Sequence, residues 1–136
     1  MERIEQVSLT DCLHLLADRS LGRVAYTDRA LPAIRAVSYA LVGTHLVLRT
    51  DVALAARLNG QVVAFEVDDA DEHPETAWSV VVTGTARLLR GPSELIRLNA
   101  GRPLLPTAGQ EHTSAVQLTP GDIRGRRVLH AAAPVA

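Results

Sequence analysis

The spacing of hydrophobic residues changes after the first twenty positions of the chain. Between Leu9 and Leu16 the apolar residues recur at mostly helical intervals, and Ser8 and Asp11 have the spacing of a capping box. Beyond Gly22, which is suited to end a helix, apolar and polar residues alternate over short segments. The pattern therefore predicts one N-terminal helix followed by a chain of strands.

Short turns join the expected strands. We predict strands at residues 21–28, 32–43, 45–50, 61–69 and 77–90, and two closing strands within 114–130 around Pro120 and Gly121. The turns between the first three strands hold only a few residues, so these strands should form an antiparallel meander. Gly84, inside the longest strand, predicts a bulge or a bend.

The segments between the strands complete the outline. Residues 51–59 are rich in Ala and predict one or two helical turns. The acidic stretch 68–76 predicts an exposed loop, 92–99 a short helix and 100–113 another loop. Neither an internal repeat nor a linker interrupts the chain. We therefore expect one domain over residues 1–136, of the α+β class and mainly β, built as a small barrel rather than a sandwich.

The composition excludes several classes of partner and reaction but says little more about the fold. The net charge of −1 gives no electrostatic reason to expect nucleic acid or an anionic membrane as a partner. All 14 basic residues are Arg, which excludes chemistry that requires a lysine, such as an internal Schiff base. The single cysteine, Cys12, excludes an intramolecular disulfide. No apolar run has the pattern of a signal peptide or a membrane span, so we expect a cytoplasmic protein.

Recognisable catalytic constellations are lacking in the sequence. The five histidines are dispersed, none has a metal-binding spacing, and no ordering of Ser, His and Asp stands out. We therefore expect no metal site and assign no catalytic residue. Cys12 and Tyr39 are expected to fill the interior rather than to react.

Five segments have an order and spacing that resemble a known superfamily. They read LGRVAYTD, PAIRAVSYAL, HLVLRT, VVAFEVDD and AWSVVVTGTARLL. Together they resemble the FMN-binding split-barrel superfamily, and most closely its pyridoxamine 5′-phosphate oxidase-like proteins of actinobacterial type, over roughly residues 5–130. The resemblance implies a six-stranded antiparallel split β-barrel with an N-terminal helix and short peripheral helices. It also implies a homodimer with one flavin in each of two clefts between the subunits.

The resemblance also carries over flavin contacts. Residues Arg35, Ala36, Val37 and Ser38 match the strand whose main chain runs along the isoalloxazine ring. Arg49 and Thr50 match the strand end that binds the ribityl phosphate, where a guanidinium, a hydroxyl and helix N–H groups suit a dianion. Trp78 and Ser79 match the strand that meets the flavin near the subunit interface.

One position departs from the family pattern. Many relatives carry a basic residue, often Lys, in the turn or helix after the threonine, whereas this chain reads DVALAARL there and offers only Arg57 nearby. Arg57 is therefore the candidate for an assisting phosphate contact, and Arg49 for the main one. A weaker FMN phosphate site also leaves open a deazaflavin or haem as cofactor, or a flavin carrier or cofactor-free dimer with no catalytic role.

FMN is the cofactor that the resemblance favours. The function it implies is that of a flavin-dependent oxidoreductase acting on a small conjugated acceptor. The expected partner is a second copy of the chain, because the run AWSVVV at 77–82 is too hydrophobic for an exposed edge strand. The small-molecule substrate itself is not readable from the residues.

Overall fold

The computed structural model describes residues 2–71, 76–90 and 113–130. Its elements, in chain order, are β1 (Glu2–Val7), α1 (Leu9–Ala17), β2 (Leu21–Asp28), β3 (Leu31–Val42), β4 (His45–Asp51), α2 (Val52–Leu58), β5 (Val62–Asp71), β6 (Thr76–Leu88) and β7 (Thr113–His130). The predicted α+β class, mainly β, is confirmed. The helix predicted at 92–99 and nearly all of the loop predicted at 100–113 lie outside the described residues.

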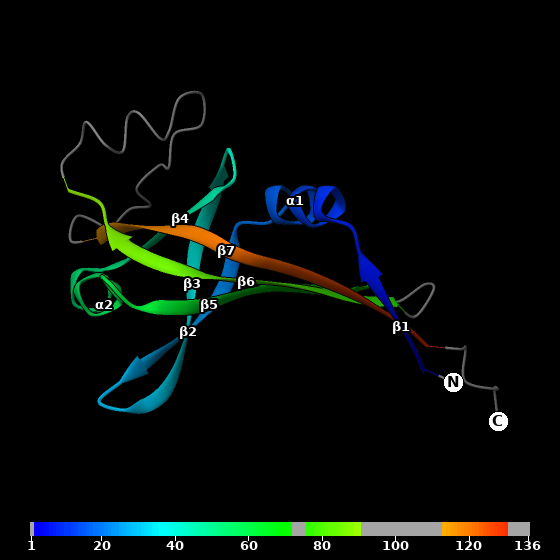
Figure 1. Cartoon of the computed structure of the whole chain (residues 1–136), viewed down its shortest axis with the longest axis horizontal. Coiled ribbons are helices and arrows are strands. Elements are labelled where there is room, and N and C mark those ends of the chain that lie inside the picture. The colour runs from blue at the N-terminus through cyan, green and yellow to red at the C-terminus, as the bar shows by residue number, and fades with distance from the viewer. Residues whose placement is uncertain (1, 72–75, 91–112, 131–136) are drawn as a thin grey trace.

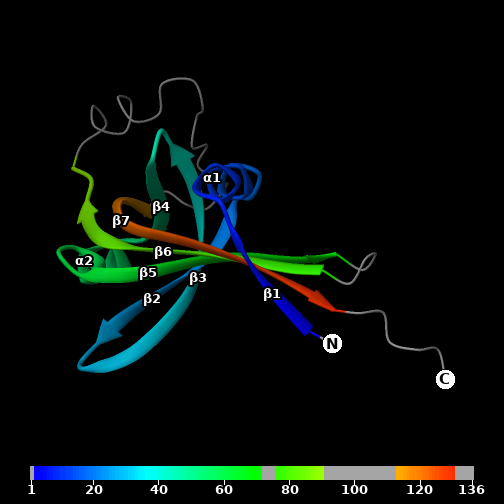
Figure 2. The same ribbon diagram turned by 45° about the vertical axis from the view of Figure 1, so that its right-hand side comes forward.

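Six strands close into a ring. The sheet order is β1-β7-β4-β3-β2-β5-β6, and β6 also pairs with β7, so the ring runs from β7 through β4, β3, β2, β5 and β6 back to β7. Figures 1 and 2 show this closed sheet, with the β2–β3 hairpin extending beyond it. The six-stranded barrel is thus confirmed as a ring, and the described part of the chain forms a seventh strand outside it.

The strand missed by the sequence pattern is β1. It pairs antiparallel with the last part of β7, from Glu2 opposite His130 to Val7 opposite Gly125, and adds no member to the ring. Its central apolar residue, Ile4, is 58% exposed. A strand that buries so little carries no clear alternation of hydrophobic and polar residues.

The barrel is split along one side of β7. On one side, β6 pairs with residues 116–129 of β7; on the other, β4 pairs with 113–118 and β1 with 125–130. Residues 119–124 therefore have no strand partner on that second side. Helix α1 lies over this interval, between β1 and the β3–β4 hairpin (Figure 1).

The two closing strands predicted around Pro120 and Gly121 are a single bent strand. β7 runs without interruption through both residues, and its register with β6 shifts between Thr83 and Gly84. Gly121 is the extra residue of this bulge, which accommodates a proline that can donate no hydrogen bond. A Cβ on Gly84 would lie 2.0 Å from the carbonyl oxygen of Thr119. The prediction of a bulge or bend at Gly84 is confirmed.

Both helices begin at side-chain caps. The hydroxyl of Ser8 accepts a hydrogen bond from the Asp11 N–H at 3.2 Å, as its sequence spacing predicts. Asp51 caps α2, its Oδ1 accepting from the Leu54 N–H at 2.8 Å. The predicted strand 61–69 and the predicted loop 68–76 overlap at Asp68 and Asp69, and there the strand is confirmed and the loop is wrong. Both residues belong to β5 and pair in register with Ser79 and Trp78.

The main core fills the interior of the ring and includes the buried faces of both helices. Its largest fully buried side chains include Phe65, Leu16, Leu48 and Leu58, from four different elements. Cys12 and Tyr39 belong to the same cluster, as expected. Within residues 2–71, 76–90 and 113–130, neither helix has the length and apolar character needed to cross a membrane.

Candidate functional site

Two adjoining hollows form a groove across the outer side of the barrel. The first has a volume of about 300 Å³ and the second about 480 Å³, and both are lined by Asp68 and Asp69. The remaining walls are Arg19, Leu21, Gly22, Arg23 and Ala36 in the first hollow, and Ala77, Trp78, Ser79 and Val128 in the second. We call this continuous feature the β2–β6 groove. It joins two segments that the resemblance assigns to the flavin, at Ala36 and at Trp78–Ser79.

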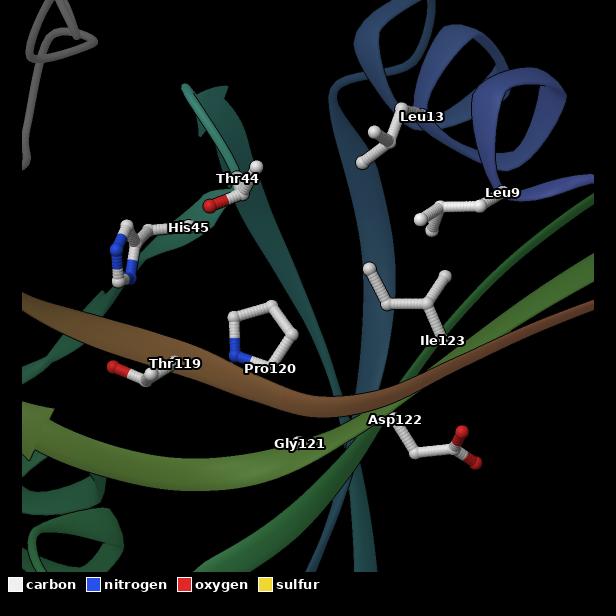
Figure 3. Close-up of a pocket in the computed structure, with 9 residues that line it drawn as sticks. All are labelled: Leu9, Leu13, Thr44, His45, Thr119, Pro120, Gly121, Asp122 and Ile123. Carbon is white, nitrogen blue, oxygen red and sulfur yellow. The ribbon is translucent and has the colours of Figure 1, made fainter.

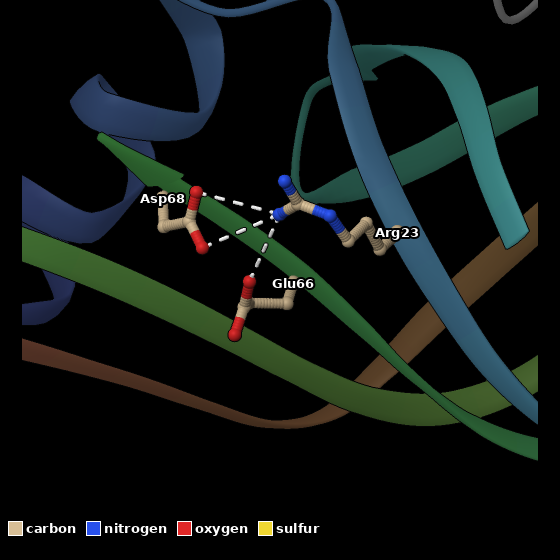
Figure 4. Close-up of polar contacts among 3 residues, drawn as sticks. All are labelled: Arg23, Glu66 and Asp68. Carbon is tan, nitrogen blue, oxygen red and sulfur yellow. Dashed lines mark hydrogen bonds and ion pairs between the residues drawn. The ribbon is translucent and has the colours of Figure 1, made fainter. Parts of the chain in front are cut away.

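A three-residue charge cluster includes two residues that line the groove, Arg23 and Asp68, and a third beside them, Glu66. Arg23 Nη1 is 3.3 Å from Glu66 Oε1 and 3.3 Å from Asp68 Oδ2 (Figure 4). The alternation of β5 explains this geometry, because Glu66 and Asp68 point to the same face and Glu66 is in register with Arg23 on β2. One guanidinium therefore serves two carboxylates, and all three side chains are accessible to solvent.

The two carboxyl groups of this cluster titrate as a pair. A hydrogen bond with Asp68, followed by partial burial, raises the pKa of Glu66, whereas the same hydrogen bond lowers the pKa of Asp68. Arg23 opposes the rise at Glu66 and favours the ionised form of both groups. A proton shared by such a pair is held on Glu66 in preference to Asp68.

Trp78, in the wall of the second hollow, lies beneath the guanidinium of Arg19, which lines the first. The guanidinium of Arg19 is 5.7 Å from the centroid of the Trp78 ring and forms an ion pair with Asp69. Trp78 is only 7% exposed, so it belongs both to the core and to the wall of the second hollow. Ser79, its neighbour, points to the outer face with Asp68 opposite.

The side chains of residues 35–38 in β3 alternate between the two faces of the sheet. Ala36 and Ser38 are exposed on the outer face, whereas Val37 is 4% exposed and packs in the core. Arg35 lies opposite Val24 in register but is exposed, and its Nη2 is 2.8 Å from Asp51 Oδ2. At Ala36 and Ser38 the outer face of β3 therefore presents small side chains and main chain, as a bound planar ring would require.

The structure does not bring the three predicted phosphate residues, Arg49, Thr50 and Arg57, together. Arg49 lies opposite Ser38 on the outer face, and its Nε is buried with no hydrogen-bond partner among the described residues. Thr50 follows it in the extended strand, so its side chain points inward with Leu48, and it is 6% exposed. Arg57 is paired with Asp28 near the β2–β3 turn. Arg49 is thus the one predicted phosphate residue with an unsatisfied donor on the outer face.

Sequence reasoning missed the charged half of the groove. Arg19 and Arg23 were not identified as site residues. Asp68 and Asp69, although they end the predicted strand 61–69, were interpreted as part of a solvated acidic loop. A signal was present in the two-residue spacing of Glu66 and Asp68 inside a strand-like run, which places both on one face. Their pairing with Arg23 depends on β2 lying beside β5, which only the sheet order reveals.

Comparison with known proteins agrees with this architecture. A family model described as pyridoxamine 5′-phosphate oxidase matches residues 8–127. A Mycobacterium tuberculosis protein of uncharacterized function, Rv0080, is 35% identical over 133 residues, covering 93% of this chain and 86% of the relative.

Two solved structures extend the comparison. The FAD binding protein of Mycobacterium smegmatis superposes with a TM-score of 0.76 and 31% identity, over 92% of this chain and 98% of that one. A putative pyridoxamine 5′-phosphate oxidase from Corynebacterium glutamicum has a TM-score of 0.73 and 27% identity, over 94% and 95% of the two chains.

Proposed function

We propose, because this chain belongs to the pyridoxamine 5′-phosphate oxidase family, that it binds a flavin nucleotide and acts as a flavin-dependent oxidoreductase on a small conjugated acceptor. The observation that carries the proposal is Arg49, whose buried Nε lacks a partner among the described residues and faces the same side as Ser38. A buried donor without an acceptor is costly, so an anionic group at this position would satisfy it.

The residues present fit a flavin in the groove. The outer face of β3, with Ala36 and Ser38, leaves room for the ring and offers main-chain groups to its polar edge. Arg49 would hold the phosphate, and the wall formed by Trp78 and Ser79 would limit the ring on the other side. A bound flavin supplies the hydride or electron transfer, and the chain supplies orientation and charge.

The choice between FMN and FAD is a second question. FMN is our first candidate, because a single phosphate needs only one strong cation and Arg49 provides it. FAD is the alternative, because the M. smegmatis relative at 31% identity is named as an FAD binding protein. Titration with FMN, FAD and riboflavin separates the two candidates by affinity.

We also propose that the protein is a homodimer with the cofactor at the subunit interface. The run AWSVVV at 77–82 does not support the dimer, because β6, which contains it, lies between β5 and β7 and is not an edge strand. Support now comes from large apolar side chains that one chain leaves exposed. They include Leu21, Leu31, Ile34, Val52 and Val62, each more than half exposed.

The experiment uses the purified protein and added flavin. The protein is incubated with excess FMN or FAD, free flavin is removed, and the absorption of the bound flavin is recorded. The bound flavin is then reduced chemically without oxygen and mixed with a quinone or a nitroaromatic compound. We expect one flavin per chain and reoxidation by the acceptor. A protein that retains no flavin contradicts the proposal, and one that holds flavin inert to every acceptor restricts it to a carrier.

A further inference from the structure

The split in the barrel leaves one backbone edge of the described residues without a strand partner. This is the free side of residues 119–124 of β7, where a cavity of about 450 Å³ lies between β7, α1 and the β3–β4 hairpin. Figure 3 shows Leu9 and Leu13 of α1 projecting over this interval toward Ile123. Pro120 offers no N–H there and the bulge interrupts the ladder, so this edge is closed to a further strand.

The outer edge of β1 is open in a way that the split is not. β1 is the end strand of the sheet, and none of the other described strands lies on its outer side (Figures 1 and 2). Its pairing with β7 runs from Glu2 to Val7 without a shift of register, so its backbone is regular over the whole strand. A regular, uncovered edge presents unpaired N–H and C=O groups on which another strand can pair.

The side chains of β1 are complementary to a second copy of the same strand. In a symmetric antiparallel pair centred on Ile4, Arg3 of each copy lies opposite Glu5 of the other, and Ile4 lies opposite Ile4. Centring the pair on Arg3 or on Glu5 would place like charges directly opposite each other, which is destabilising. The charges therefore favour the register centred on Ile4.

The charged face of β1 retains the capacity for such a contact. Arg3 and Glu5 form an ion pair along the strand, and their side chains are 72% and 37% exposed. Arg127 of β7 lies opposite Glu5 on the inner side of β1. A second copy would add its own Arg3 on the other side of Glu5, so charges of alternating sign would follow one another across three strands.

The opposite face of β1 contributes an apolar contact. Ile4 lies opposite Val128 of β7, which in turn lies opposite Ala77 of β6, and Val128 and Ala77 both line the second hollow of the groove. Ile4 is thus the exposed end of an apolar row that begins in the groove wall. The Ile4 side chain of a second copy would continue this row and cover part of the surface that one chain leaves in water.

We propose that the outer edge of β1 pairs antiparallel with the same edge of a second copy, centred on Ile4. The contact is isologous, since each copy contributes the same residues to a closed pair. It involves one short strand from each copy, so we expect it to be weaker than the homodimer proposed above and to form at higher protein concentration. It requires neither a bound flavin nor that homodimer.

Introduced thiols test the register. In Ile4→Cys the two thiols are on directly opposite residues, whose Cα atoms lie about 4.5–5.5 Å apart, within the range of a disulfide. Gln6→Cys is the matched control, because Gln6 is exposed on the same face but its two copies would lie about 14 Å apart along the strands. Concentrated protein without flavin is oxidised with glutathione disulfide and analysed on a non-reducing gel. We expect a covalent dimer for Ile4→Cys and none for Gln6→Cys or for the wild type, whose one cysteine, Cys12, is buried.

Charge exchange tests the pairing itself. In the Ile4→Cys background, Arg3→Glu should slow cross-linking about 10-fold, because it makes both charged cross-strand pairs repulsive. Arg124→Glu is the matched control, since Arg124 also forms an exposed ion pair with a residue two positions away, Asp122, but lies on β7 outside the contact. Mixing chains that carry Arg3→Glu with chains that carry Glu5→Arg should restore cross-linking, because opposite charges then face each other again.

Three results would overturn the proposal. They are cross-linking of Ile4→Cys no faster than that of Gln6→Cys, equal slowing by Arg3→Glu and Arg124→Glu, and mixed chains that cross-link as slowly as either variant alone. The melting temperature of each variant, measured first, shows that it is folded. Because the experiment contains no flavin, its failure would leave the proposed function as it stands.

Discussion

At the scale of single residues, the chemistry of this protein depends on which face of a strand each side chain occupies. Arg49 and Thr50 were predicted as one phosphate site, yet they point to opposite faces of β4. Tyr39 is buried, its hydroxyl donating to the Leu16 carbonyl oxygen at 2.6 Å, and desolvation raises its pKa to about 12. The sequence predicted that Tyr39 fills the interior, whereas the phosphate role of Arg49 and Thr50 stays a prediction. It could not assign faces near a strand end, where register decides.

The Arg23 cluster yields a prediction about titration. In Arg23→Gln, the pKa values of Glu66 and Asp68 should both rise, because the positive charge that favours their ionised forms is removed. Carboxyl carbon shifts followed by NMR over a pH series measure both values. Arg3→Gln, which removes a pair with Glu5 on β1, is the control and should leave them unchanged. Unaltered titration of Glu66 in Arg23→Gln would show that the cluster is absent in solution.

At the scale of elements, the sequence predicts features that depend on local residue types better than it predicts which strands pair. The cap at Ser8 and the bulge opposite Gly84 follow from residue types and were predictable. The exposed strand β1 and the continuous path of β7 were not, because each depends on a neighbour that is distant in sequence. Pro120 and Gly121 resemble a turn, and only pairing with β6 on both sides of them keeps the strand extended.

The bulge in β7 can be tested with two glycines. In Gly84→Ala, the added methyl group would meet the Thr119 carbonyl oxygen at 2.0 Å, so we expect a loss of about 2–3 kcal/mol in unfolding free energy. Gly121→Ala is the matched control, because its nearest atom would be 3.6 Å away, an ordinary contact. Urea denaturation measures both. Equal stability of the two variants would mean that the strands do not approach as described.

The cap of α2 has a pH-dependent signature. Asp51→Ala should lower the unfolding free energy by about 1 kcal/mol at neutral pH, and Asp51→Asn by less, because Asn also caps helices. The Leu54 N–H and then Arg35 lower the pKa of Asp51, so its contribution is complete above its ordinary pKa and is lost as pH falls through the lowered value. The difference between wild type and Asp51→Ala should therefore shrink in acid. A difference that is constant with pH contradicts an ionised cap.

At the scale of the whole molecule, the hollows and the exposed apolar residues lie on different parts of the barrel surface. The β2–β6 groove lies on the outer face, the cavity lies in the split beside α1, and exposed apolar residues gather on β2, β3, β5 and the start of α2. The family resemblance indicated the closed ring and the segments along the groove. The charge cluster between those segments required the sheet order.

The homodimer is the prediction that belongs to this scale. Sedimentation at micromolar concentration should give a mass twice the 14.6 kDa of one chain. Ile34→Glu should shift the protein toward monomer, because it places a charge among the exposed apolar residues of β3. Ile4→Glu is the control, on β1 at the opposite end of the molecule from the β2–β3 hairpin (Figures 1 and 2). A wild-type protein that sediments only as a monomer contradicts the shared cleft.

The central claim is that Arg49 anchors a flavin phosphate on the outer face of the barrel. Quenching of flavin fluorescence on titration with FMN and with riboflavin tests it in wild type, Arg49→Gln and Arg57→Gln. We predict that wild type prefers FMN and that Arg49→Gln loses this preference, binding FMN about 10- to 100-fold more weakly and riboflavin as before. Arg57→Gln should resemble wild type, because Arg57 is paired with Asp28. If Arg49→Gln keeps the wild-type preference for FMN, the phosphate site is not at Arg49 and the account is wrong.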